Sequence, residues 1–182
     1  MILGMSRSTF VVVHTSLSVV AIIGGFFVVF TFLNGTLSRL WNAVFLLTTT
    51  LTSASGFLFP RTRVTPGIVL GILSVTLLCI AIVALYGFRL RSHWRRIYVI
   101  SALIPFYFNL VVLLAIMFAR ISVLQMLASA TRGAAFSIAQ VLLLILAIGV
   151  IAIAVKKFCL TPSSDLWKWN RVEGLPRDAG GS

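Results

Sequence analysis

Acidic side chains are almost absent from this chain, and none precedes Asp165. A carboxylate within a membrane usually marks a proton relay, a cation site or a metal centre. The apolar part of the chain therefore lacks most of the chemistry on which intramembrane enzymes and pumps depend.

Histidine and cysteine are also scarce, with two of each. His14 and His93 fall near opposite sides of the predicted membrane, too far apart to be the two axial ligands of one haem. Cys79 and Cys159 are not spaced as metal ligands. No nucleophile–base pair or phosphate-binding loop is visible. We therefore expect a non-enzymatic protein with no metal and no other cofactor.

Hydrophobic residues make up 60% of the 182 residues and charged residues only 10%, which is typical of a multi-pass membrane protein. A helix crosses the hydrocarbon layer with about 20 apolar residues. Five segments are long enough, namely residues 10–33, 40–59, 67–88, 97–119 and 134–155. The predicted fold is therefore an all-α integral membrane bundle of five transmembrane helices over residues 1–160, followed by a partly flexible cytoplasmic tail, residues 161–182.

The net charge of +12 comes from basic residues that cluster between the apolar segments. This position favours membrane lipids as partners, and no nucleic acid. With five crossings, one side has Arg7, Arg61, Arg63, Arg120 and Arg132. The other side has twice as many: Arg39, Arg89, Arg91, Arg95, Arg96, Lys156, Lys157, Lys168, Arg171 and Arg177. The positive-inside rule then predicts an outer amino terminus and a cytoplasmic carboxyl terminus.

All four tryptophans fall on the side predicted to be cytoplasmic. Tryptophan and arginine gather at the depth of the lipid headgroups in membrane proteins. The predicted membrane-interface anchors are Trp41, Arg89, Arg91, Trp94, Arg95, Arg96 and Trp167.

Uncharged polar side chains fall at similar depths in the outer half of the spans. Depths counted at about 1.5 Å per residue predict one polar pocket that opens outward. Its candidate residues are His14, Thr52, Ser55, Asn109 and Gln140. The hydroxyls of residues 48–56 could instead hold helices together or bond to their own helix.

Pro105 removes a backbone donor from the fourth span and should kink it one turn before Asn109. The kink could present backbone and amide groups to a ligand, or simply bend the helix around a neighbour. Residues 121–130 could form a short amphipathic helix above the pocket, as a lid or as a linker.

Residues Thr52-Ser53-Ala54-Ser55-Gly56-Phe57-Leu58-Phe59-Pro60, Tyr107-Phe108-Asn109 and Ala139-Gln140 resemble a group of small uncharacterised bacterial inner-membrane proteins with no established activity. The resemblance implies a bacterial inner (plasma) membrane location and a single domain, and it names no substrate.

The leading hypothesis is an inner-membrane protein whose pocket binds a neutral, hydrogen-bonding ligand such as a quinone or a lipid, because the pocket holds no fixed opposite charge for an ion. Alternatives are an accessory subunit or assembly factor of a larger membrane complex, and a small transporter. Small-residue faces such as Gly24-Gly25 and Gly67-x-x-x-Gly71 would also permit a homo-oligomer.

Overall fold

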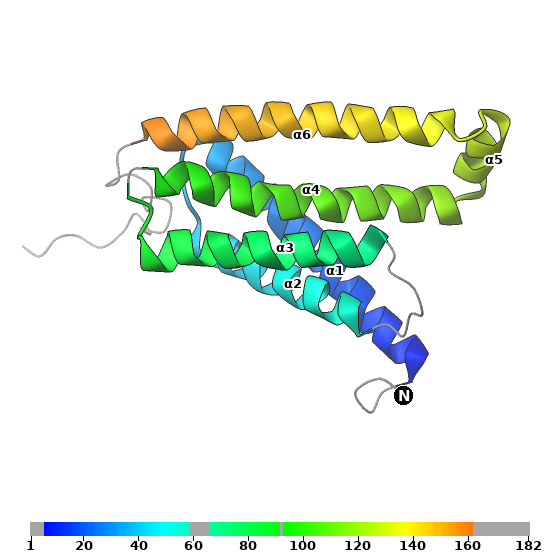
Figure 1. Ribbon diagram of the computed structural model, residues 1–182, viewed down its shortest axis with the longest axis horizontal. Coiled ribbons are helices and arrows are strands. Elements are labelled where there is room, and N and C mark those ends of the chain that lie inside the picture. Colours follow the sequence, from blue (N-terminus) through cyan, green and yellow to red (C-terminus); the bar gives the residue numbers. More distant parts are fainter. Residues whose placement is uncertain (1–5, 59–65, 92, 162–182) are drawn as a thin grey trace, which may run out of the picture.

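The computed structural model describes residues 6–58, 66–91 and 93–161, and this part of the chain is all-α (Figure 1). Its helices are α1 (Arg7–Leu33), α2 (Arg39–Phe57), α3 (Pro66–Ile82), the π-helical turn η1 (Val83–Gly87), α4 (Trp94–Arg120), α5 (Ser122–Ala130) and α6 (Ala134–Leu160).

Each segment predicted to cross the membrane forms a helix, and α5 forms where the short amphipathic helix was expected. Ser6 caps α1 by accepting a hydrogen bond from the Thr9 N–H at 3.1 Å. Gly35, with φ of +68°, turns the chain between α1 and α2. The predicted end of the second span at Phe59, the outer arginines Arg61 and Arg63, and the tail beyond Thr161, Trp167 included, lie outside the described residues.

Four of the described helices are long and apolar enough to cross a membrane: α1, α3 continued by η1, α4 and α6. Helix α2 is not among them, because Arg39, Asn42 and six hydroxyl side chains lower its hydropathy. The fold is thus a helical bundle with four candidate membrane spans, and a fifth crossing by α2 stays a prediction.

The long helices run alternately in opposite directions, so their ends form two groups (Figure 1). We call the end with Ser6, Leu58 and α5 the amino-terminal end, and the end with Gly35, Arg91 and Thr161 the carboxyl-terminal end. Arg7, Arg120 and Arg132 belong to the amino-terminal end. The remaining described basic residues belong to the other: Arg39, Arg89, Arg91, Arg95, Arg96, Lys156 and Lys157.

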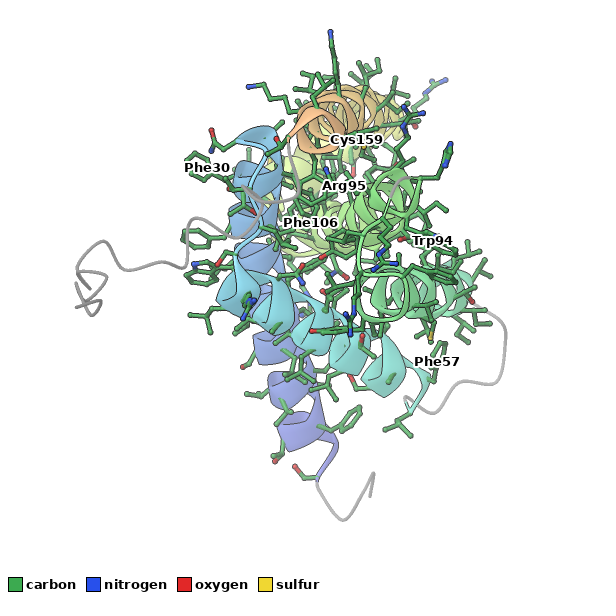
Figure 2. All side chains as sticks on the ribbon, turned by 90° about the vertical axis from the view of Figure 1, so that its left-hand side faces the viewer. Phe30, Phe57, Trp94, Arg95, Phe106 and Cys159 are labelled. Atoms are coloured by element: carbon green, nitrogen blue, oxygen red, sulfur yellow. The ribbon has the colours of Figure 1, made fainter. Side chains whose placement is uncertain are left out.

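The hydrophobic core lies mainly in the half of the bundle near the carboxyl-terminal end. It is built from the last turns of α1, α3 and α6 and the first turns of α2 and α4, with Phe32, Phe45, Tyr98 and Phe158 fully buried. Phe106 of α4 occupies the middle of the bundle when it is viewed along its length (Figure 2). Helix α1 is inclined to α4 and α6 and separates from α6 towards the amino-terminal end (Figure 1). The amino-terminal half is therefore packed less tightly.

Candidate functional site

A cleft of about 240 Å³ lies in this less tightly packed half, between α1, α2, α3 and α4. Its apolar wall comes largely from α4, including Val112, Leu113 and Ile116. Its polar lining comes from all four helices: His14, Thr15, Ser18, Thr52, Ser53, Ser74 and Asn109. Apolar walls with a few converging polar groups are typical of small-molecule sites.

His14 of α1 is held against α2 by Ser55, with 2.8 Å between His14 Nδ1 and Ser55 Oγ. The Ser55 hydroxyl also donates to the Thr52 carbonyl at 3.0 Å. A hydroxyl has one proton, so this pattern requires His14 Nδ1–H to donate to Ser55 Oγ. The Ser18 hydroxyl donates to the His14 carbonyl at 2.9 Å. The bond to Ser55 holds the ring of His14 in the lining of the cleft, whereas the Ser18 bond involves only the backbone of His14.

Two other lining residues have buried polar atoms that no hydrogen bond satisfies within the described part of the chain. They are Thr52 Oγ1 and Asn109 Nδ2, both buried. Thr52 is only 7% exposed. A buried polar atom without a partner costs about 1–3 kcal/mol. A ligand that reached these two covered atoms with hydrogen-bond acceptors would recover part of that free energy.

The remaining hydroxyls of α2 behave differently. Thr48 and Thr50 donate to the carbonyls of Val44 and Leu46, each at 2.7 Å, as the back-bonding alternative predicted. Thr49 Oγ1 is buried and unpaired in the described structure, but Thr49 does not line the cleft. Thr52 is therefore the residue of α2 that both lines the cleft and has a buried, unpaired hydroxyl within the described structure.

Gln140 does not lie with the other candidates. It belongs to α6, which packs on α4, α1 and α5, whereas the cleft lies among α1, α2, α3 and α4. Gln140, a predicted member of the pocket, is therefore not among the residues that line this cleft, because α6 is not one of the four helices that form it. Its Oε1 is also buried and unpaired within the described residues.

Pro105 is buried inside α4, which continues through it without interruption. Pro105 predicts a kink, but it does not break the helix. Pro105 itself does not line the cleft, while Phe108 and Asn109, one turn further on, do.

Sequence reasoning missed several residues of the cleft. On α3, Gly67, Gly71 and Ser74 recur at spacings of four and three residues and line it together. The spacing of the two glycines alone predicts a helix-packing face, which leaves Ser74 out. The spacing that joins Ser74 to the glycines is the signal that could have identified it.

Two of the predicted interface anchors form aromatic stacks. Trp41 stacks on Phe27 with ring centroids 3.9 Å apart, and Trp94 stacks on Phe88 with centroids 3.6 Å apart. Both indoles are half-buried at the carboxyl-terminal end, where the described basic residues are most numerous.

No group of three or more histidine, cysteine or acidic side chains within the described residues could hold a metal ion. The chain matches no protein-family model, no curated protein and no solved structure. The resemblance to small bacterial inner-membrane proteins therefore stays a prediction. The function of the chain has to be inferred from the geometry of the cleft.

Proposed function

We propose that this chain is a five-span membrane protein whose cleft binds a neutral ligand with acceptor oxygens, such as a quinone headgroup or the ester region of a lipid. The observation that carries the proposal is the pair of unpaired, buried polar atoms in the cleft, Thr52 Oγ1 and Asn109 Nδ2. Both groups can donate a hydrogen bond to a carbonyl oxygen.

The neutral character of the ligand follows from the lining of the cleft, which includes no lysine, arginine, aspartate or glutamate. An ion taken out of water needs an opposite charge or several strong dipoles to offset its desolvation. The apolar side chains of α4 suit a ring or an acyl chain instead.

A fifth crossing by α2 is supported by its length and by its hydroxyls. Its 19 residues extend roughly 28 Å at 1.5 Å per residue, close to the hydrocarbon thickness. Thr49, Thr52 and Ser53 are buried, and Thr48 and Thr50 bond to their own helix, so few of its hydroxyls would meet lipid. The excess of basic residues then favours a cytoplasmic carboxyl-terminal end and a cleft in the outer half of the membrane.

The test compares Thr52→Val with Thr50→Val, using ubiquinone-1 and dioleoylglycerol as probes in thermal unfolding assays of the detergent-solubilised protein. Valine has nearly the shape of threonine but lacks the hydroxyl. We expect Thr52→Val to weaken binding of the preferred probe about three- to tenfold, the effect of one net hydrogen bond. Without a probe, Thr52→Val should be as stable as the wild type or more stable, because it removes an unpaired polar atom. Asn109→Leu should weaken binding similarly.

Thr50→Val is the matched control, since Thr50 lies on the same helix but bonds to the Leu46 carbonyl. It should bind the probe as the wild type does. If neither probe stabilises the wild type, or if both threonine variants bind equally well, the proposed ligand class is wrong.

A further inference from the structure

The loop between η1 and α4, at the carboxyl-terminal end, has a backbone that side chains rarely adopt. Arg89 and Leu90 follow one another with φ of +49° and +55°, in the left-handed region. Leu90 is nevertheless buried, with 3% of its surface exposed, and its N–H donates to the Ala84 carbonyl at 3.1 Å. Burial of Leu90 therefore fixes the loop. Strained backbone of this kind often accompanies a functional site.

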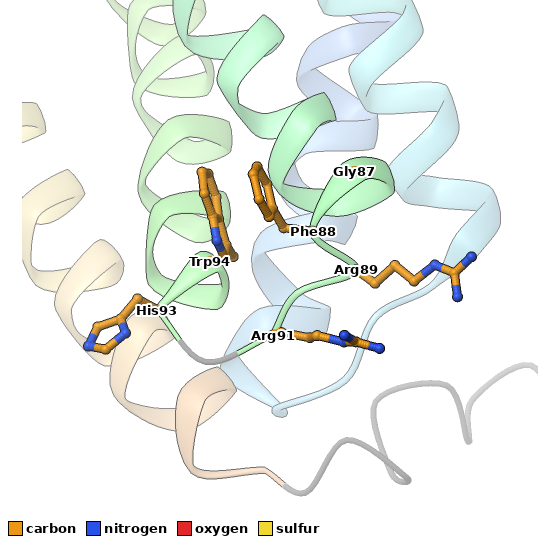
Figure 3. Close-up of a pocket in the computed structure, with 6 residues that line it drawn as sticks. All are labelled: Gly87, Phe88, Arg89, Arg91, His93 and Trp94. Carbon is orange, nitrogen blue, oxygen red and sulfur yellow. The ribbon is translucent and has the colours of Figure 1, made fainter.

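Burial of Leu90 places its two neighbours, Arg89 and Arg91, at the surface, and both are exposed. Their side chains extend towards the same side of the loop, whereas His93 extends towards the other (Figure 3). The stacked rings of Phe88 and Trp94, inclined by only 3°, extend along the helices and away from the two guanidinium groups (Figure 3). The loop thus presents two guanidinium groups at the surface, with an aromatic pair at its base.

Arg95 has a different role from these two arginines. Its Nε–H donates to the Leu90 carbonyl at 3.0 Å, and its Nη1 donates to the Thr161 carbonyl at 2.6 Å. Arg95 therefore joins the loop to the end of α6 and is not simply an interface anchor. Its bonds hold the backbone that displays Arg89 and Arg91.

An open hollow of about 620 Å³ is lined by Gly87, Phe88, Arg89, Arg91, His93 and Trp94. No acidic side chain belongs to the described residues, because Asp165, Glu173 and Asp178 all lie beyond them. Within the described structure, the charges of Arg89 and Arg91 are therefore not neutralised by a carboxylate.

We propose that this hollow binds the phosphodiester headgroup of an anionic phospholipid, with Arg89 and Arg91 donating hydrogen bonds to the phosphate oxygens. Guanidinium groups suit phosphate because they can donate two parallel hydrogen bonds. The Phe88–Trp94 pair would contact the glycerol and the first acyl carbons, as aromatic residues do at headgroup depth. Free phosphate shares the charge but has no apolar part to meet the aromatic rings, so the lipid is favoured.

Native mass spectrometry of the full-length protein can test this site by comparing retention of dioleoyl phosphatidylglycerol with that of dioleoyl phosphatidylcholine. Replacing Arg89 and Arg91 together by glutamine should weaken binding of phosphatidylglycerol by roughly tenfold or more, from the loss of two charges near a lipid phosphate. Binding of phosphatidylcholine should change little, and inorganic phosphate at millimolar concentration should not displace the lipid.

The matched control replaces Arg120 and Arg132 at the amino-terminal end, which removes the same charge. Arg132 has the same φ as Arg89, +49°, so the backbone strain is matched as well. Equal losses from the two double variants, or no loss from either, would overturn the site. Displacement of the lipid by inorganic phosphate would instead identify a free-phosphate site.

If the Arg89/Arg91 variant does not fold, Arg91→Gln alone, at a position without positive φ, should weaken binding of phosphatidylglycerol about fivefold.

Discussion

Tyr98 is the buried polar residue whose removal should affect stability most clearly. It is fully buried near the start of α4, and its hydroxyl donates to Asn42 Oδ1 of α2. Tyr98→Phe removes this donor and leaves the Asn42 oxygen without it in the core. We expect a loss of about 1–3 kcal/mol in the free energy of unfolding, measured by chemical denaturation in detergent.

The control for this substitution is Tyr86→Phe, since Tyr86 is 65% exposed. It should change the free energy of unfolding by less than about 0.5 kcal/mol. Equal effects of the two substitutions would show that the Tyr98–Asn42 hydrogen bond contributes nothing to stability.

At the residue scale, the sequence could predict the position of a side chain along its helix but not the direction in which it points. His14, Thr52 and Asn109 line one cleft, and Ser55 bonds to His14, although they come from three helices. Gln140 has a similar predicted height but lies on α6, away from the cleft. Height follows from counting residues along each helix, whereas direction depends on which helices pack together. Which helices pack together cannot be predicted from a single sequence.

At the element scale, Gly25 lets the ring of Phe106 approach the backbone of α1. A Cβ atom added at Gly25 would overlap this ring, whereas one added at Gly149 of α6 would meet nothing within 4 Å. Gly25→Ala should therefore lower the free energy of unfolding by about 1–3 kcal/mol, the usual effect of overpacking a core. Gly149→Ala should be neutral or stabilising by up to about 1 kcal/mol. Thermal unfolding of the two purified variants in the same detergent would compare them, and similar losses for both would contradict this account of the packing.

The helices themselves were largely predictable, because long apolar runs bounded by glycine, proline and arginine leave few alternatives in a membrane. The details at their ends were not. The third span was expected to continue to Phe88 as an ordinary helix, but it changes to a π-helical turn at Val83. Arg89 and Leu90 are neither glycine nor asparagine, the residues that usually adopt the left-handed conformation, so the sequence did not indicate their positive φ. Tertiary burial of Leu90 imposes this conformation.

At the scale of the whole molecule, the two halves of the bundle differ. Aromatic rings fill the half near the carboxyl-terminal end, while small and hydroxyl side chains such as Gly71, Ser53 and Ser74 leave a cleft in the other half. Close packing at one end can hold the helices together while the other end remains open to a ligand. The described basic residues are also divided unequally between these ends. The proposed outward opening of the cleft therefore depends on which end faces the cytoplasm.

The most direct measurement is labelling by a membrane-impermeant maleimide in intact bacterial cells that express the chain. Both native cysteines would be replaced by serine, and a single cysteine would then be introduced as Ser129→Cys at the amino-terminal end or His93→Cys at the other. The account predicts that the Ser129→Cys variant is labelled in intact cells and that the His93→Cys variant is labelled only after the membrane is permeabilised. Labelling of both variants from outside, or the reverse pattern, would contradict the proposed five crossings or their orientation, and with them an outward-facing cleft.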